Sequence, residues 1–176
     1  MLRPAYVTEF ERYRRRLPHH EEPGATYFLT ICLVRPAPVD LTAPDLARLV
    51  VEALDFYDGN SYYLYEYTVM PDHLHVLLKP TTEDGKTHSV SRIVYRLKHW
   101  LSRQINEVAN REGDLWQRES YDHVIRYGDD YLEKANYIFF NAHKAGLVDD
   151  PAEWRWWGVG SSIRTKSGAA AKEGRG

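Results

Sequence analysis

The segment from residue 89 to residue 110 limits the possible folds most, because its apolar residues recur every three or four positions. That spacing places them on one face of an α-helix. The residues that share this face are Val90, Ile93, Val94, Leu97, Leu101, Ile105 and Val108. A helix of about six turns with one apolar face must bury that face against a second layer of structure. The sequence therefore predicts a layered fold.

The rest of the chain between residues 26 and 145 alternates between strand and helix patterns. Runs rich in β-branched and aromatic residues predict strands, and amphipathic runs bounded by turn residues predict helices. We expect strands over residues 26–34, 62–70, 73–79 and 115–125, and two further helices over residues 42–57 and 129–145. Thr42 resembles a helix-capping hydroxyl, and Gly146 is expected to end the last helix. The order βαββαβα indicates an α+β fold: a ferredoxin-like antiparallel sheet flanked by helices, with an added C-terminal helix.

The length of 176 residues fits one domain, predicted over residues 25–163. Residues 1–24 form an arginine-rich arm, either a solvated extension or a contact for DNA, and residues 164–176 form a polar tail predicted to be disordered. The chain has neither a long apolar stretch nor an apolar leader, so we expect no membrane span and a cytoplasmic location. The single cysteine, Cys32, excludes an intramolecular disulfide and is expected to be a small core residue.

His73 and His75 are the first candidates for a functional site. Residues two apart on a strand point to the same face, so the two imidazole rings can converge on one cation. Leu74 points to the opposite face, into the core, together with Val76 and Leu78. The chain has eight histidines, so a His-x-His pair can also arise by chance, and two surface histidines on a strand are the alternative.

The predicted last helix adds groups of a different kind. Its apolar stripe consists of Tyr131, Leu132, Ala135, Ile138, Phe139 and Ala142. A second face carries Glu133, Tyr137, Asn141 and Lys144, at spacings of four, four and three. The Asn141 oxygen can complete a set of two nitrogens and one oxygen for Mg²⁺ or Mn²⁺, and a cation near Tyr137 favours the nucleophilic phenolate. Taken alone, Tyr137 would be interpreted as a half-buried packing residue, and only its combination with the other groups favours catalysis.

Basic residues supply candidate DNA contacts. One stripe of the long helix carries Arg92, Arg96, His99 and Arg103, and the later part of the chain adds Arg118, Arg126 and Lys144. Such groups can track a phosphate backbone, and the aromatic residues Trp116 and Tyr121 can stack on bases. A solvated helix face and plain sheet packing are the alternatives. The net charge of −2 weighs against nucleic-acid binding by the chain as a whole, although a local basic patch can suffice.

Several segments together resemble a known family. Residues 67–78 (YTVMPDHLHVLL) resemble the HUH motif, in which two histidines flank an apolar residue, as it stands in small tyrosine transposases. Further segments resemble the REP-associated tyrosine transposases. They are residues 23–30 (PGATYFLT), 115–118 (LWQR), 121–126 (YDHVIR), 137–141 (YIFFN), 144–147 (KAGL), 154–156 (WRW) and 161–162 (SS). The resemblance covers about residues 23–163. The combination is specific, although no single segment is.

The resemblance implies an HUH nuclease fold and a mechanism. In this family two histidines and a polar residue one turn after the tyrosine bind a divalent metal, Mg²⁺ or Mn²⁺. The tyrosine attacks single-stranded DNA to form a 5′-phosphotyrosine link and a free 3′-OH, so the strand can be rejoined without ATP. Carried over to this chain, His73, His75 and Asn141 would be metal ligands and Tyr137 the nucleophile. The implied partner is single-stranded or hairpin DNA of the bacterial chromosome, bound by a monomer, with a dimer as the alternative.

The chain departs from the family pattern at two positions beside the predicted site. Relatives usually have proline after the ligand asparagine, where this chain has Ala142, and often have histidine where this chain has Phe139. These departures leave two other functions open. One is a hairpin-binding protein that no longer cuts DNA, and the other is an unrelated metal oxygenase of the cupin type that uses a His-x-His strand.

Overall fold

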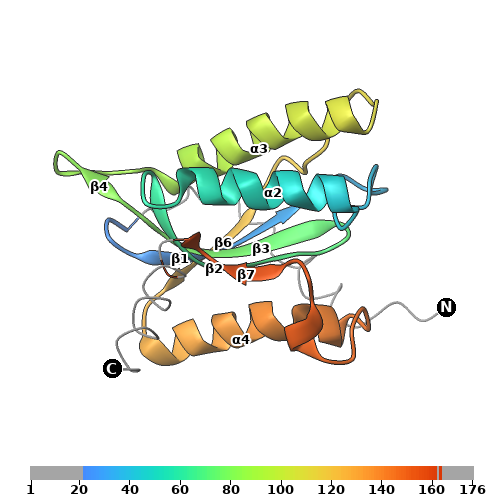
Figure 1. The fold of residues 1–176 in the computed structure, drawn as a ribbon. Coiled ribbons are helices and arrows are strands. Elements are labelled where there is room, and N and C mark those ends of the chain that lie inside the picture. Colours follow the sequence, from blue (N-terminus) through green and yellow to red (C-terminus); the bar gives the residue numbers. More distant parts are fainter. Residues whose placement is uncertain (1–21, 162, 164–176) are drawn as a thin grey trace, which may run out of the picture.

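The computed structural model describes residues 22–161 and residue 163, which are drawn in colour in Figure 1. Most of the predicted arm (residues 1–21) and the whole predicted tail (residues 164–176) lie outside the described residues. No helix in the described part of the chain is both long enough and apolar enough to span a membrane.

Five strands form an antiparallel sheet in the order β6-β1-β3-β2-β7. Their bounds are Thr26–Cys32 (β1), Tyr62–Val69 (β2), His73–Pro80 (β3), Tyr121–Ile125 (β6) and Trp157–Val159 (β7). A separate two-stranded hairpin consists of Thr82–Glu83 (β4) and Lys86–Thr87 (β5). The central strand β3 pairs with β1 on one side and with β2 on the other, so both edges of its histidine segment are covered by neighbouring strands.

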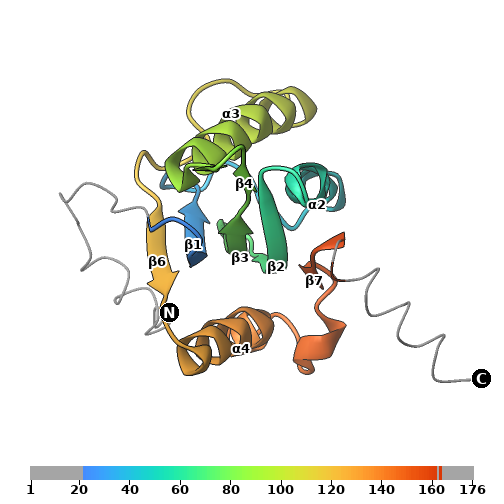
Figure 2. The same cartoon turned by 90° about the vertical axis from the view of Figure 1, so that its left-hand side faces the viewer.

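Helices lie on both faces of this sheet, as Figures 1 and 2 show. Helices α2 (Pro44–Tyr57) and α3 (Val90–Val108) pack side by side on one face, and α4 (Gly128–Lys144) lies on the other. A short 3₁₀ helix, η1 (Pro151–Glu153), connects α4 to β7. The predicted antiparallel sheet flanked by helices, with an added C-terminal helix, is therefore confirmed. An open sheet of this kind excludes the cupin alternative, which requires a barrel built of many more strands.

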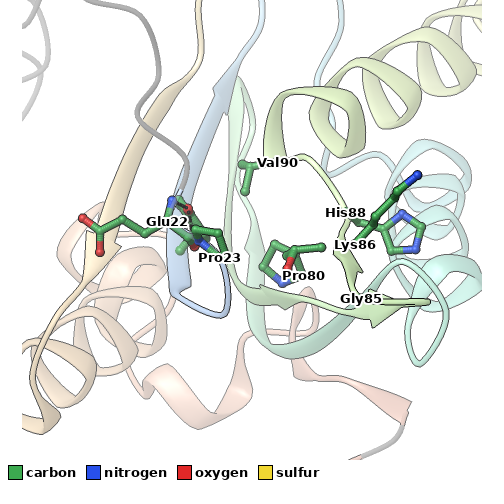
Figure 3. A pocket seen from close by; sticks show the side chains of 9 residues that line it. Glu22, Pro23, Pro80, Gly85, Lys86, His88 and Val90 are labelled. Carbon is green, nitrogen blue, oxygen red and sulfur yellow. Dashed lines mark hydrogen bonds between the residues drawn. The ribbon is translucent and has the colours of Figure 1, made fainter.

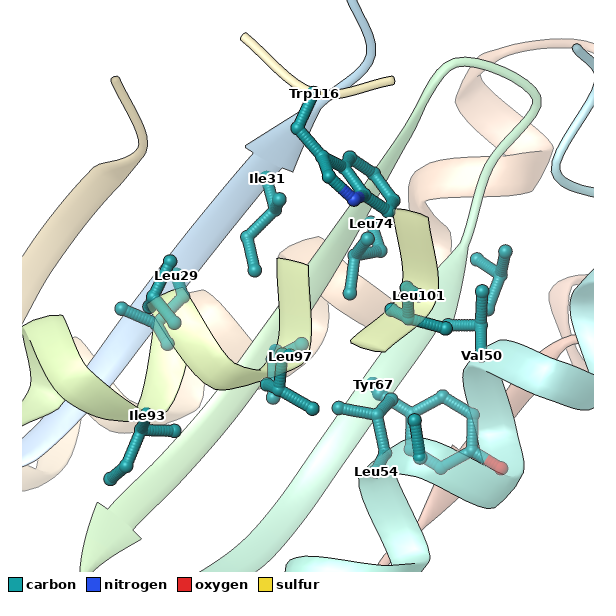
Figure 4. Packing of buried hydrophobic residues seen from close by; sticks show 14 of the residues in the cluster. Leu29, Ile31, Val50, Leu54, Tyr67, Leu74, Ile93, Leu97, Leu101 and Trp116 are labelled. Atoms are coloured by element: carbon teal, nitrogen blue, oxygen red, sulfur yellow. The ribbon is translucent and has the colours of Figure 1, made fainter. Parts of the chain in front are cut away.

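The main core fills the space between the sheet and the pair α2 and α3 (Figure 4). It contains the apolar face predicted for the long helix, apart from Val108, which is 55% exposed, and it contains Leu74, Val76 and Leu78 from β3. A second, smaller cluster of Phe28, Leu77 and Ile138 lies between the sheet and α4. Because successive residues of a strand point to opposite faces, β3 contributes to both clusters.

A β-bulge between Leu64 and Glu66 changes which residues of β2 face each layer. Before the bulge, Tyr62 and Leu64 point into the main core. One extra residue reverses the alternation, so Tyr67 and Val69 take over that side and Glu66 is turned toward α4. The bulge thus places a carboxyl group on the α4 face of the sheet.

Four details differ from the prediction. Only residues 121–125 of the expected strand 115–125 form a regular strand, and Trp116 makes an isolated bridge to Leu33. Neither β7 nor the β4–β5 hairpin was expected. Helix α2 has Ala43 at its N-cap with no side-chain cap, because the Thr42 hydroxyl donates to Asp40 instead. On α4 the predicted apolar residue Leu132 is 60% exposed. Gly146, with a φ of 72°, follows α4 as expected.

Candidate active site

The two histidines of β3 lie on the α4 face of the sheet, as the alternation predicts. Their ring centroids are 4.7 Å apart. In the register between β1 and β3, Thr30 is paired with His75 and Cys32 with His73, so both strands contribute side chains to the same spot. Cys32 is half-buried beside the histidines rather than in the main core, and burial raises the pKa of its thiol to about 11, with a further contribution from Asp72.

Each histidine has a hydrogen bond at its Nδ1 atom. The Nδ1 of His75 and the hydroxyl of Thr30 share one of 2.8 Å, and the Nδ1–H of His73 donates to the carboxylate of Asp72 at 2.6 Å. When the Nδ1 of a histidine is held in this way, its Nε2 becomes the atom that can coordinate a cation. The hydrogen-bond partners of the two histidines differ, because Thr30 is neutral and buried whereas Asp72 is charged and half-exposed.

The protonation states suit this role. His75 is fully buried, and burial holds the pKa of its imidazole well below the usual range, with a smaller contribution from His73. His75 is therefore neutral at physiological pH and keeps a lone pair for a ligand bond. The hydrogen bond from His73 is the main reason that the pKa of Asp72 lies below its usual range. A carboxylate that stays ionised strengthens the donor character of the histidine it holds.

Helix α4 brings Tyr137 and Asn141 to the histidines. The ring of Tyr137 lies 5.1 Å from that of His75 and 5.8 Å from that of Phe28, between centroids, and the Lys144 ammonium is 5.6 Å from the Tyr137 ring centre. A cavity of about 320 Å³ opens here, and both histidines, Tyr137 and Asn141 line it. Tyr137 is the only tyrosine in the described part of the chain that lines this cavity. Groups from β3 and α4, more than sixty residues apart, thus converge on one site.

The cavity can hold a divalent cation only with a mixed set of donors. In residues 22–161 and 163, no three side chains drawn from His, Cys, Asp and Glu lie close enough together to bind a metal by themselves. Two imidazole nitrogens and the Asn141 amide oxygen are present, and this set leaves positions for water or a phosphate oxygen. The residues therefore fit a catalytic, incompletely coordinated cation better than a closed structural site.

The structure does not bring the predicted DNA contacts together in one place. Arg92, Arg96, His99 and Arg103 are exposed on α3, on the opposite face of the sheet from the cavity. Arg118 is exposed in the segment next to the cavity, and Arg126 is exposed at the end of β6, 3.7 Å from Glu22. Lys144 is the only member of this set that contacts Tyr137 among the contacts of the described residues.

Several residues of the cavity were not expected from the sequence. Thr30, Arg35, Asp72 and Gln117 all line it. Asp72 carries a signal in hindsight, since it directly precedes the first histidine in the turn between two strands. Thr30 carries none, because its position opposite His75 depends on the register of β1 against β3, 45 residues away.

A buried carboxyl group lies farther along the same face. Glu66 is 8% exposed and accepts a hydrogen bond of 2.6 Å from the indole N–H of Trp157. Burial raises the pKa of Glu66, and the Trp157 hydrogen bond opposes that shift. The Trp157 ring also packs at 5.0 Å against Phe139 of α4, one of the two positions where the chain departs from the family pattern. The other, Ala142, is fully buried.

A larger hollow of about 500 Å³ lies elsewhere, between the β4–β5 hairpin and the start of β1 (Figure 3). Glu22, Pro80, Lys86, His88 and Val90 are among the residues that line it. It contains none of the predicted site residues. The smaller cavity under α4 is therefore the candidate active site.

Comparison with known proteins gives concordant matches. Residues 45–138 match the model of the family described as "Transposase IS200 like". A Haemophilus influenzae protein assigned to the REP-associated tyrosine transposases is 30% identical over 144 residues, covering 74% of this chain and 77% of the relative. The REP-associated tyrosine transposase of Escherichia coli is 23% identical over 150 residues, covering 84% of this chain and 80% of the relative.

A solved structure shares the fold. It is a REP-associated tyrosine transposase bound to a REP hairpin, and it superposes with a TM-score of 0.64 over 81% of each chain at 21% identity. At that identity the likeness concerns the arrangement of the sheet and helices. It agrees with the antiparallel sheet, the two helices on one face and the single helix on the other.

Proposed function

Because the chain belongs to the IS200-like transposase family, and within it to the REP-associated tyrosine transposases, we propose that it cuts and rejoins single-stranded DNA through Tyr137. The observation that carries this proposal is the convergence of Tyr137 and Asn141 from α4 with His73 and His75 from β3 in one cavity. The substrate class is REP-like hairpin DNA with a single-stranded segment, the kind of DNA that the solved relative binds.

The covalent step balances without an external energy source. The Tyr137 oxygen attacks the phosphorus of a phosphodiester, a phosphorus–oxygen bond to Tyr137 forms, and the bond to the 3′ oxygen breaks. The products are a 5′-phosphotyrosine and a free 3′-OH, with the phenol proton passing to the leaving oxygen through solvent. In the reverse direction a 3′-OH attacks the same phosphorus and releases the phenol. One phosphodiester replaces another, so the strand can be rejoined without ATP.

Tyrosine transposases generally use a divalent metal. In this chain His73, His75 and Asn141 would hold it, and bound Mg²⁺ or Mn²⁺ would polarise and orient the phosphodiester. The protein's own residues do the rest. Thr30 and Asp72 fix the orientation of the two imidazole rings, Phe28 packs against the rings of His75 and Tyr137, and Lys144 places a positive charge beside the phenol.

A covalent-adduct assay tests this function. Hairpin DNA with a single-stranded extension is incubated with the protein and Mn²⁺, and a protein–DNA adduct that survives denaturation is expected. Tyr137→Phe should abolish the adduct. Tyr131→Phe is the matched control, because Tyr131 lies six residues earlier on α4 and packs in the same layer but does not line the cavity.

The outcomes separate the remaining alternatives. An adduct that persists in Tyr137→Phe would move the nucleophile to another tyrosine. Metal-independent hairpin binding without any adduct in the unchanged protein would instead support a binding protein that no longer cuts, for which the departures at Phe139 and Ala142 are the structural grounds.

A further inference from the structure

Helix α3 carries a charge that contrasts with the rest of the chain. It contains four Lys or Arg residues and one Glu, a net charge of +3, whereas the whole chain has a net charge of −2. The helix packed beside it, α2, has one Arg against two Asp and one Glu. Among the helices of the described residues, α3 is therefore the one with the highest positive charge.

Three of the four cations of α3 point away from the protein, whereas the fourth, Lys98, is half-buried and donates to the Gln117 carbonyl. Arg92, Arg96 and Arg103 are exposed, and their positions on the helix lie opposite the buried stripe that includes Ile93, Leu97 and Leu101. Between them the exposed ring of Tyr95 stacks on His99, with centroids 5.8 Å apart and planes 12° from parallel. The outer face of α3, the helix at the top of Figures 1 and 2, is therefore a convex ridge that carries three cations with an aromatic pair among them.

These arginines differ from an ordinary exposed arginine of the same layer. On α2, Arg48 is held by Asp45 at 3.1 Å, the i,i+3 pair that solvated helices commonly form. Arg92, Arg96 and Arg103 make no ion pair with any described residue. Unpaired arginines in a row match a partner with repeated negative charges, of which the phosphate backbone is the relevant one for a DNA enzyme.

The ridge lies apart from the candidate active site, but the segment that follows α3 links the two. Helix α3 lies on the face of the sheet opposite α4 (Figure 2), and Tyr137 of α4 lines the cavity, so the ridge cannot hold the phosphodiester that Tyr137 attacks. The segment after α3 links the two sides: Trp116 donates to the Lys98 carbonyl, and the Lys98 ammonium donates to the Gln117 carbonyl at 3.0 Å. Gln117 itself lines the cavity and Arg118 is exposed beside it. A DNA strand that leaves the ridge would follow residues 115–118 into the cavity.

We propose that the outer face of α3 binds the double-stranded stem of the hairpin, while residues 115–118 lead its single-stranded extension to the cavity. This inference rests on the proposed function, since it assumes a DNA substrate. Arg92 and Arg103 are eleven residues apart, about 16 Å along the helix axis. Side chains at that separation reach phosphates on both sides of a major groove, which is about 12 Å wide. The convex ridge fits a duplex groove, whereas single strands are bound in concave channels.

Binding of two probes to one triple variant tests the proposal. Arg92→Gln, Arg96→Gln and Arg103→Gln are combined in a Tyr137→Phe background, so that no covalent adduct disturbs the equilibrium. The probes are a hairpin with a stem of about ten base pairs plus a single-stranded extension, and the same extension without the stem. The triple variant should bind the hairpin at least about tenfold more weakly, with a salt dependence reduced by about 0.9 per lost phosphate contact. Its binding of the extension alone should change less than about twofold.

Arg48→Gln on α2 is the matched control, and it should leave both affinities unchanged. Circular dichroism and thermal unfolding establish that the triple variant is folded, which is expected because the three positions are exposed and glutamine is a good helix former. Unchanged hairpin affinity overturns the proposal. An equal loss for both probes also overturns it, because it assigns α3 to the single strand or to a general field effect. Failure of the proposed function would show separately, as the absence of an adduct in the protein with Tyr137 intact.

Discussion

The two faces of strand β3 have opposite characters, although they belong to the same eight residues. The side toward α2 and α3 carries Leu74, Val76 and Leu78 and belongs to the large apolar core. The side toward α4 carries His73, His75 and Leu77, and the neighbouring strands add Thr30 and Glu66 there. The first face stabilises the fold by burying apolar area. The second face also buries polar groups, which hydrogen bonds hold in fixed positions. The proposed chemistry thus lies in the layer with the smaller apolar cluster.

Alanine at the two adjacent leucines of β3 tests this division most strongly. Leu77 and Leu78 are both 0% exposed but belong to opposite clusters. Leu78→Ala should lower the free energy of unfolding by about 3–5 kcal/mol, because the large core cannot collapse around the cavity. Leu77→Ala should cost about 2–3 kcal/mol, since partly exposed rings around it can shift, and should reduce adduct formation several-fold.

Urea unfolding and the adduct assay measure the two effects separately. The adduct yield per folded molecule should stay unchanged in Leu78→Ala. An equal loss of stability in both variants, with no effect of Leu77→Ala on the adduct, would show that the α4 layer is as rigid as the main core. It would contradict the difference between the two faces of β3.

The second prediction concerns the carboxylate of Asp72, which is half-exposed at the edge of the polar face. Asp72→Asn should weaken Mn²⁺ binding by about 10- to 100-fold, because the neutral amide no longer strengthens and orients the imidazole of His73. Mn²⁺ affinity is measured directly, by electron paramagnetic resonance of the free ion, and not through activity. Asp45→Asn on α2 is the control, since it removes an exposed carboxylate from the other layer. If both variants bind Mn²⁺ like the unchanged protein, Asp72 has no positioning role.

The sequence predicts the features of this contrast that depend on local periodicity. Alternation on a strand separates His75 from Leu74, and helical spacing puts Tyr137 one turn before Asn141, so these features follow from intervals of one to four residues. The prediction that these groups act together rests on the donor set they offer and on the family resemblance, because spacing within one element cannot place two elements side by side. Leu132 shows the limit even for local patterns, because α4 contacts the sheet along a narrower stripe than its apolar sequence indicates.

The partners of the polar groups could not be predicted, since they depend on strand register over long intervals. Thr30 meets His75 across 45 residues, and Trp157 meets Glu66 across 91. The short strand β7 has only three residues and includes Gly158, so it has no strand pattern of its own. Gly158 of this strand pairs with Tyr67, and an added Cβ there would lie 2.6 Å from the tyrosine oxygen, so a side chain would not fit without a shift of the tyrosine.

The smallest expected effect concerns Glu66, the buried carboxyl that β7 covers. Burial raises its pKa in the folded protein, so the folded state holds the proton more tightly than the unfolded state. Stability therefore falls as the pH rises from the ordinary glutamate pKa, near 4.3, through the higher folded value, and then levels off. Glu66→Gln keeps an oxygen for the Trp157 N–H and removes this loss. The variant should match the unchanged protein near pH 4 and exceed its stability at pH 7 by roughly 1 kcal/mol or less.

Unfolding free energies measured from pH 4 to pH 7 decide the matter, with Glu133→Gln as the control on the exposed side of α4. A Glu66→Gln variant that is less stable than the unchanged protein at pH 7 alone would mean that the Trp157 hydrogen bond outweighs burial and that the ionised carboxylate stabilises the fold. The α4 face would then hold its charge at no cost in stability. The expected result, a gain at neutral pH, would mean that the layer carrying the proposed catalytic groups is kept below its attainable stability by a buried acid.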